Sequence, residues 1–280
     1  MREIHVDEVI RQVDHAVTQA NIYLPTDIVK AYQEALVKET NPRAKRFLEI
    51  SMENADLAAE QCMALCQDTG VVNVEVEIGQ DVHVTGGLLE DAINQGVRIG
   101  YQKGYFRNSV VGHPLERVNT RDNTPALINY KVVQGDAIKM TIFPKGAGSE
   151  NMGRLTMLKP SQGIEGVKEF VITAVREASS NPCPPIVVGV GIGGGMEKAA
   201  ALAKKALFRD VYQRHPDSMI ADLETELLAK VNALNIGPQG LGGDTTALGV
   251  NVEIFATHIA CLPVAVNIGC NCTRRYTVTI

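Results

Sequence analysis

The chain has 280 residues, of which 45% are hydrophobic and 21% charged, and its formal net charge is −5. This composition is ordinary for a globular protein long enough to bury a substantial core, and the acidic balance offers no basic surface for nucleic acid. No apolar run approaches the roughly 20 residues of a membrane span, and residues 1–20 lack the apolar core of a signal peptide. We therefore expect a cytoplasmic protein, in which six cysteines are more typical of metal-binding, catalytic or buried thiols than of disulfides.

The N-terminal third of the sequence has the hydrophobic spacing of helices. Helices are predicted over Val6 to Val17, around Ile28 to Leu36, and from about Ala44 to Leu65. Cys62 lies on the third of these helices, where we expect a small buried apolar residue. The helical pattern ends at Cys66–Gly70, a stretch that carries a thiol, an amide, a carboxylate and a hydroxyl before a glycine that tolerates positive φ.

The rest of the sequence mixes strands with helices. Alternating apolar and polar residues predict a half-buried strand from Val72 to Ile78, and two later strands joined around Gly135 are expected as hairpin-like neighbours. The other expected elements are helices over 86–103, 167–178, 196–208 and 217–233, and strands over 126–133, 137–143, 186–190 and 250–254. We predict a mixed α/β (α+β) fold with a helical N-terminal third, a mixed sheet with flanking helices, and a single large catalytic domain over residues 1–280.

Three glycine-bearing segments interrupt these elements. Lys145–Asn151 either presents backbone N–H groups to an anion or forms an ordinary connection. Gly191–Gly195 follows a strand and opens a helix, as in many phosphate sites, but its spacing is not a dinucleotide fingerprint. We therefore favour a glycine-lined wall beside an active site over a nucleotide-binding module. Asn235–Thr246 has too many glycines for regular structure and too many polar groups for a spacer.

Three cysteines stand far apart in the sequence, each in its own turn: Cys66, Cys183 and Cys270. Prolines on both sides hold Cys183 in a stiff extended turn, which suits a fixed ligand. Three thiolates can hold three irons of a cubane cluster and leave the fourth iron open to act as a Lewis acid on a substrate hydroxyl. A structural zinc ion would also accept three cysteines and a histidine, so the spacing leaves both metals open.

Cationic and imidazole side chains complete the set of candidates. Arg107 and Arg274 are suited by type to clamp the carboxylates of a substrate. His258 lies among apolar residues, where a lone histidine is more often a satisfied core residue than a catalyst.

Five motifs occur in a specific order along essentially the whole chain: Cys66–Gly70, Lys145–Asn151, Asn181–Pro185, Gly191–Gly195 and Asn235–Thr246. In this combination the chain resembles the class I fumarate hydratase family. More narrowly, it is similar to the alpha subunit of the two-subunit form, a group shared with tartrate dehydratase. The motifs are specific for the family and much less specific for the substrate.

The resemblance implies an iron–sulfur cofactor. Cys66, Cys183 and Cys270 match the three ligands of a [4Fe–4S] cluster. Cys270 is preferred to the neighbouring Cys272 as the third ligand, because it follows the Val266-Asn267 run as in the relatives.

The resemblance also implies a set of substrate residues. Gln67 and Asp68 match groups near the bound substrate, with Asp68 in proton transfer, and Arg107 matches a carboxylate-binding arginine. Gly146 falls in the loop whose backbone touches the substrate. His258 matches an active-site histidine, which replaces the expectation of a core residue.

The activity implied by the resemblance is the reversible hydration of fumarate, a small dicarboxylate, to (S)-malate. In the dehydration direction a base removes a proton beside one carboxylate, while the open iron takes the hydroxyl from the neighbouring carbon. A separate beta subunit is expected to share the active site and to supply further cationic clamps and a base. L-Tartrate dehydratase or a related hydroxy-acid dehydratase is the nearest alternative, and a non-catalytic iron–sulfur or zinc protein is the alternative of a different class.

Overall fold

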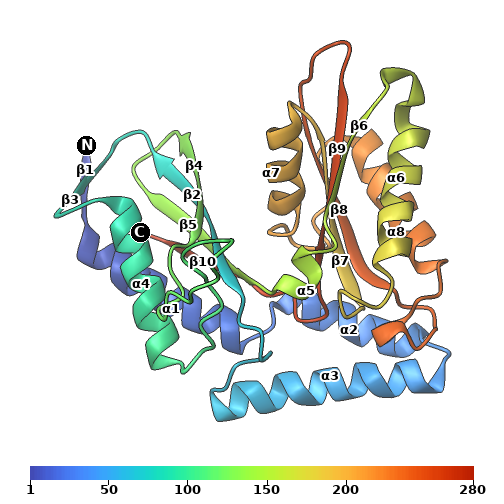
Figure 1. Cartoon of the computed structure of the whole chain (residues 1–280), viewed down its shortest axis with the longest axis horizontal. Helices are drawn as coiled ribbons and strands as arrows, with labels where there is room; N and C mark the ends of the chain where they lie inside the picture. Colours follow the sequence, from blue (N-terminus) through green and yellow to red (C-terminus); the bar gives the residue numbers. More distant parts are fainter. The chain divides into compact units, whose positions relative to one another are not determined.

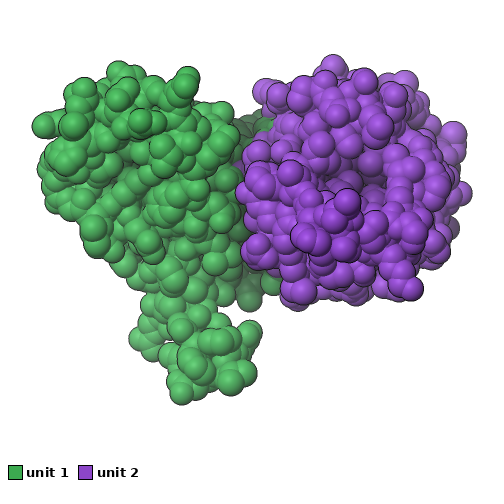
Figure 2. All heavy atoms as spheres, turned by 90° about the horizontal axis from the view of Figure 1, so that it is seen from above, with its two compact units in different colours: residues 1–25, 54–147, 274–280 green, residues 26–53, 148–273 purple.

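The computed structural model describes residues 1–280. The chain divides into two compact units, each assembled from separated segments (Figure 2). Unit 1 comprises Met1–Pro25, Asn54–Ala147 and Arg274–Ile280, and unit 2 comprises Thr26–Glu53 and Gly148–Thr273. Because the segments interleave along the chain, no linker marks the boundary, and the sequence predicts one domain instead. That the two units act as one catalytic domain stays a prediction.

Unit 1 is built on a four-stranded sheet (Figure 1). Its elements are β1 (Arg2–His5), α1 (Val6–Ile22), β2 (Val71–Gly79), β3 (Val82–Thr85), α4 (Leu89–Lys103), β4 (Leu127–Val133), β5 (Ile138–Lys145) and β10 (Tyr276–Thr279). The strand order is β10-β5-β2-β4, with β2 parallel to β4 and antiparallel to β5. A separate parallel pair joins β1 to β3.

The strands β4 and β5 are not neighbours, so the predicted hairpin around Gly135 is wrong. β2 lies between them in the sheet. The physical reason is burial: Val72, Val74 and Val76 of β2 are all at 0% exposure, and a strand buried this completely occupies the centre of a sheet. β4 therefore pairs with the far side of β2 instead of with the strand that follows it in sequence.

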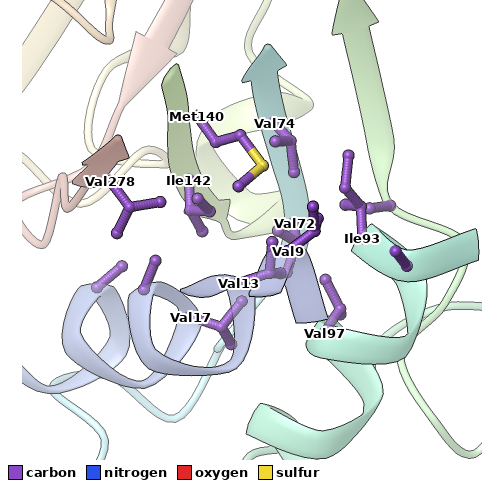
Figure 3. Close-up of a cluster of buried hydrophobic side chains, with 14 of the residues drawn as sticks. Val9, Val13, Val17, Val72, Val74, Ile93, Val97, Met140, Ile142 and Val278 are labelled. Atoms are coloured by element: carbon purple, nitrogen blue, oxygen red, sulfur yellow. The ribbon is translucent and has the colours of Figure 1, made fainter. Parts of the chain in front are cut away.

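The covered face of this sheet and the helices α1 and α4 share one apolar core (Figure 3). Helical spacing puts Val9, Val13 and Val17 on one stripe of α1, all at 0% exposure. α4 approaches this stripe closely, because a Cβ added at Gly96 would lie 2.6 Å from the Cβ of Val13. Full burial of each such aliphatic side chain contributes about 1.5–3 kcal/mol, so this stripe sets the position of α1.

Unit 2 contains a second four-stranded sheet with helices on both faces (Figure 1). Its elements are α2 (Thr26–Lys38), β6 (Arg154–Leu158), η1 (Pro160–Gln162), α6 (Gly163–Ala178), β7 (Ile186–Gly193), α7 (Met196–Ala206), α8 (Ser218–Asn232), η2 (Pro238–Gly240), β8 (Ala247–Phe255) and β9 (Leu262–Gly269). Two further helices, α3 (Pro42–Gln61) and α5 (Ala147–Glu150), have residues in both units. The strand order is β6-β9-β7-β8, with β7 parallel to β8 and antiparallel to β9. No helix of the chain combines the length and the apolar character that crossing a membrane requires. The predicted mixed α/β fold is confirmed.

The faces of the second sheet are covered differently. α6 and α8 pack on the face that carries Val188, Val250 and Val266, whereas α7 packs on the other face. The approach of α7 depends on glycine, because a Cβ added at Gly191 would lie 2.1 Å from the carbonyl oxygen of Ala199. The first glycine of the Gly191–Gly195 motif therefore serves helix–sheet packing.

The third predicted helix ends earlier than expected. α3 stops at Gln61, and Cys62 follows with a φ of 51°. Cys62 is exposed, so the prediction of a small buried residue is wrong. With Arg11, His15 and Lys103 it lines a surface cavity of about 690 Å³ in unit 1, which includes no residue of the Cys66–Gly70 turn.

A buried ion pair joins α8 to the segment after α7, beside β8. Glu224 is fully buried, and its carboxylate accepts hydrogen bonds from the backbone N–H groups of Val252 at 2.9 Å and His215 at 3.1 Å. The same carboxylate pairs with Arg209, which also contacts Glu253 at 2.9 Å. Removing one partner of such a pair leaves charge and polar groups unsatisfied in a dry interior.

We expect Glu224→Gln to lower the free energy of unfolding by about 3 kcal/mol, because Arg209 loses its most buried counter-charge. Equilibrium urea denaturation measures the change. Glu226→Gln is the matched control: Glu226 pairs with Lys168 and Lys230 at the surface, so its replacement should change stability little. Equal effects of the two substitutions would contradict the structural role of Glu224.

Candidate functional site

The first group of candidate residues lies in the Cys66–Gly70 turn of unit 1, between α3 and β2. Gly70 ends this turn with a φ of 71°, and a Cβ added there would lie 2.3 Å from the carbonyl carbon of Lys145. Glycine is required at this position on both counts, since the left-handed backbone and the close approach each exclude a side chain. The turn therefore sits directly against the end of β5.

The structure brings Asp68 and Gly146 together. The Asp68 carboxylate accepts the backbone N–H of Gly70 at 3.1 Å through Oδ1 and that of Ala147 at 3.0 Å through Oδ2. A Cβ added at Gly146 would lie 2.8 Å from Oδ2 of Asp68. The segment after β5 thus donates the Ala147 N–H to the Asp68 carboxylate, so within this chain the predicted anion-binding loop binds Asp68.

Buried side chains hold the carbonyl groups of this turn. The Tyr101 hydroxyl donates to the Thr69 carbonyl at 2.7 Å, and burial raises the pKa of Tyr101 to about 12, so this donor stays neutral. The Asn123 amide donates to the Gly70 carbonyl at 3.0 Å. The Arg274 guanidinium, only 2% exposed, donates to the Asp68 carbonyl at 2.6 Å. Arg274 is therefore a buried brace of the turn, and its predicted role as a carboxylate clamp is not supported.

Two more predicted residues are exposed beside the same turn. Gln67 belongs to the turn itself. Arg107 is tied to it through the backbone, because the Thr69 hydroxyl donates to the Arg107 carbonyl at 2.8 Å. Asn123, which is fully buried, also accepts the Ser109 N–H at 2.7 Å and so fixes the segment after Arg107. Unit 1 thus groups five of the predicted site residues: Cys66, Gln67, Asp68, Arg107 and Gly146.

The second group of candidates is in unit 2, at the start of β7. Cys183 is exposed, has a φ of 55°, and precedes a cis peptide between Pro184 and Pro185. The Gln239 N–H donates to the Pro184 carbonyl at 2.8 Å. The prolines predict an extended backbone at Cys183, whereas the structure has a left-handed one. The Asn235–Thr246 segment holds this turn through the Gln239 N–H.

The Asn235–Thr246 segment is itself anchored to the end of α2. Glu39, only 5% exposed, accepts the backbone N–H groups of Asp244 and Thr245, each at 3.0 Å. The Asp244 carboxylate accepts the Thr40 hydroxyl at 2.6 Å, and the hydrogen bonds from Thr40 lower the pKa of Asp244. These reciprocal hydrogen bonds fix the glycine-rich segment, which in turn holds the Cys183 turn through the Gln239 N–H.

The turn that carries Cys270 lies beside the Cys183 turn. The Asn271 N–H donates to the Cys183 carbonyl at 3.0 Å. The Thr273 N–H and hydroxyl both donate to the Cys270 carbonyl, at 2.9 and 2.7 Å. On the other side, the Tyr32 hydroxyl of α2 donates to the Asn271 carbonyl at 3.0 Å. Cys183 and Cys270 are thus held at one end of the sheet by a continuous chain of hydrogen bonds.

His258 lies at the opposite end of this sheet. Cys183 precedes β7 and Cys270 follows β9, whose Gly269 pairs with Val187, whereas His258 is in the connection from β8 to β9. The eight residues of β7 span about 25 Å, which separates His258 from both cysteines. His258 is exposed, so it is not a buried core residue, and the structure does not bring it to the cysteines of unit 2.

The Gly191–Gly195 segment shares the His258 end of the sheet. Gly194 donates its N–H to the Ala256 carbonyl at 3.1 Å and accepts the Thr257 hydroxyl at 2.9 Å. A Cβ added at Gly195 would lie 2.8 Å from the carboxylate oxygens of Glu197, so an acidic side chain of α7 covers this helix N-terminus. The predicted glycine-lined wall therefore lies away from Cys183 and Cys270.

Comparison with known proteins decides which family these turns belong to. A family model described as fumarate hydratase (Fumerase) matches residues 10–279. The chain belongs to the fumarate hydratase family. It is 46% identical over 263 residues to a Methanocaldococcus jannaschii protein whose provisional name is L(+)-tartrate dehydratase subunit alpha, with 92% of each chain covered. It is 33% identical over 261 residues to the L(+)-tartrate dehydratase subunit alpha of Escherichia coli (strain K12), with 92% of this chain and 86% of that protein covered.

Membership of the fumarate hydratase family confirms the predicted enzyme class, a hydro-lyase. The thiol chemistry of the chain fits the donors that an iron–sulfur cluster takes, because no disulfide joins its six cysteines. Cys183 and Cys270 belong to unit 2 and Cys66 to unit 1. No group of three or more His, Cys, Asp or Glu side chains is placed to hold a single metal ion. Joint ligation by the three cysteines stays a prediction.

Sequence reasoning missed the residues that brace the two groups of candidates. Tyr101, Asn123, Tyr32 and Glu39 occupy ordinary positions in the helices and loops around them, and no local motif marks them. Their role depends on carbonyl and N–H groups that lie far away in the sequence, as in the hydrogen bond between Tyr32 and Asn271. A polar side chain on the buried face of a predicted helix, such as Tyr32 on α2, was the one available signal.

We expect Gly70→Ala to destabilise the protein by about 3 kcal/mol, since positive φ and contact with the Lys145 backbone both oppose a Cβ. Gly163→Ala is the matched control: Gly163 has a φ of 52° and no atom within 4 Å of an added Cβ. Its φ of 52° and ψ of −152° form a combination that glycine alone adopts readily, so this variant measures a backbone cost of about 2 kcal/mol without a steric clash. Urea denaturation of both variants checks the difference, and equal losses would show that the Lys145 contact has no effect.

Proposed function

We propose that this chain is the cluster-bearing alpha subunit of an iron–sulfur hydro-lyase that reversibly hydrates fumarate to (S)-malate. The observation that carries the proposal is the exposed pair Gln67 and Arg107 beside the backbone-bound carboxylate of Asp68, in a member of the fumarate hydratase family. A four-carbon dicarboxylate has the carboxylate and hydroxyl groups that these side chains can bind and exchange protons with.

In this proposal Arg107 binds one substrate carboxylate. A guanidinium presents two parallel N–H donors to a carboxylate, and Arg107 is exposed and available for such contacts. Gln67 supplies an amide donor and acceptor next to it. The backbone around Gly146 closes the site on the side of β5, where the absence of a Cβ leaves Asp68 accessible.

Asp68 is the proposed proton-transfer residue. Two backbone N–H groups fix the orientation of its carboxylate, and the buried Arg274, Tyr101 and Asn123 fix the main chain beneath it. This anchoring suits a group that must meet one substrate proton at a fixed distance. The neutral Tyr101 hydroxyl lies on the buried side of the turn and supports it without exchanging protons at working pH.

Cys66, Cys183 and Cys270 are the proposed ligands of a [4Fe–4S] cluster. When bound, the cluster would supply a Lewis-acidic iron that polarises the substrate hydroxyl. The chain's own contribution is to hold its thiols on braced turns, with Cys183 and Cys270 linked through the Asn271 N–H. Cys272 is adjacent to this linkage and is the alternative third ligand.

A second subunit completes the proposed enzyme. The two relatives are named alpha subunits, which supports a beta partner for this chain as well. That partner would supply the remaining cationic groups and a base. Their names also favour L(+)-tartrate as a second candidate substrate, because dehydration of tartrate and of malate removes a hydroxyl beside the same type of acidic C–H group.

Anaerobic reconstitution with iron and sulfide tests the cluster. We expect roughly four irons per chain, and loss of fumarate absorbance only when the beta subunit is present. Cys270→Ser and Cys272→Ser form a matched pair: the first should abolish iron uptake and the second should preserve it. Activity on tartrate but not on fumarate would show that tartrate is the substrate. Full iron uptake by the Cys66→Ser, Cys183→Ser and Cys270→Ser variants would show that these cysteines are not the cluster ligands.

Substitution of Asp68 tests the proton-transfer role. We expect Asp68→Asn to lower kcat by about 10²- to 10⁴-fold with iron content unchanged, because the amide cannot accept a proton. Asp56→Asn, in an exposed position on α3, is the control and should keep full activity. His258→Asn in the same assay tests the proposed catalytic histidine. Wild-type turnover by Asp68→Asn would exclude Asp68 as the proton-transfer group.

A further inference from the structure

A buried tyrosine on α2 reaches the turn that carries Cys270. Tyr32 is 1% exposed, and its hydroxyl donates to the carbonyl of Asn271 at 3.0 Å, although 239 positions separate the two residues. Nothing in the proposed mechanism uses this side chain. A buried tyrosine hydroxyl needs a hydrogen-bond partner, and the partner of this one is a backbone carbonyl that lies far away in the sequence.

The hydrogen bond from Tyr32 acts on a residue that lies between two cysteines. Asn271 stands between Cys270 and Cys272, and its N–H donates to the Cys183 carbonyl at 3.0 Å. One residue is thus fixed at both of its backbone polar groups, at the carbonyl by Tyr32 and at the N–H by the Cys183 turn. A displacement of Asn271 would move the main chain beside Cys270 and release the link to Cys183 together.

One other hydrogen bond of the Cys270 turn is local. Thr273 caps the Cys270 carbonyl from three residues away, and this bond moves with the turn. Tyr32 is different, because its helix packs in unit 2 independently of the turn, with Asp27 accepting the Val211 N–H at 3.0 Å. The phenol therefore connects the turn to a fixed point of the fold.

We propose that Tyr32 is a positioning residue, which sets the spacing of the Cys183 and Cys270 turns through the Asn271 carbonyl. The effect on a bound cluster rests on the proposed function, whereas the effect on the turn does not. Tyr32→Phe preserves the buried ring and removes only the hydroxyl, so the Asn271 carbonyl loses its donor while α2 keeps its packing.

Hydrogen–deuterium exchange of the chain without iron tests the positioning directly. We expect Tyr32→Phe to speed exchange in peptides covering residues 269–273 by about fivefold, with peptides from α8 unchanged. Tyr212→Phe is the matched control, because it removes another phenol hydroxyl of unit 2, one that interacts with Glu34 of the same helix α2 and not with Asn271. It should leave residues 269–273 unaffected.

The second measurement is made after anaerobic loading with iron and sulfide. After reduction with dithionite, which makes a [4Fe–4S] cluster paramagnetic, we expect Tyr32→Phe to show a shifted electron paramagnetic resonance signal, and the unreduced variant to lose iron in air faster than either wild type or Tyr212→Phe. Unchanged exchange, or an unchanged signal from the loaded variant, would overturn the proposal. If the wild-type chain takes up no iron, the proposed function fails, while the exchange experiment alone still decides whether Tyr32 holds the turn.

Discussion

The architecture of the candidate site depends on one constraint, the satisfaction of backbone carbonyl groups in tight turns. The Cys66–Gly70 turn can expose Gln67 and direct Asp68 outward because its carbonyls are bound from beneath by Tyr101, Asn123 and Arg274. A buried carbonyl without a donor would cost roughly 1–3 kcal/mol, and a turn with several such groups would refold into another shape. The braces therefore matter as much as the reactive side chains that they support.

The same constraint organises the cysteine turns of unit 2, with different residues. Gln239 holds the Pro184 carbonyl, Thr273 holds Cys270, and Asn271 joins the two turns through its N–H. Gln239 comes from the Asn235–Thr246 segment, whereas Asn271 and Thr273 belong to the Cys270 turn itself, so two separate segments determine the shape of these turns. This shared support agrees with a role in which thiols must keep fixed positions before any cofactor is present.

Glycine has two distinct uses in this chain. At Gly70 it permits a left-handed backbone against the end of β5, whereas at Gly191 it permits α7 to lie on the sheet. The sequence does not separate these two uses, because the deciding contacts, with the Lys145 backbone and with Ala199 of α7, depend on how strands and helices pack together. A motif near a strand end is therefore weak evidence of ligand binding until its neighbours are known.

The sequence by itself determined the alternating strand β2, the helical periodicity of α1 and α2, and the chemistry available in Cys66–Gly70, because these depend on residues close together in the chain. It also carried the family resemblance. Only the tertiary structure decided that β2 separates β4 from β5, that Arg274 is a buried brace, and that β9 places His258 and Cys270 at opposite ends of a sheet. These outcomes depend on packing and hydrogen bonds between distant segments, which local spacing does not encode.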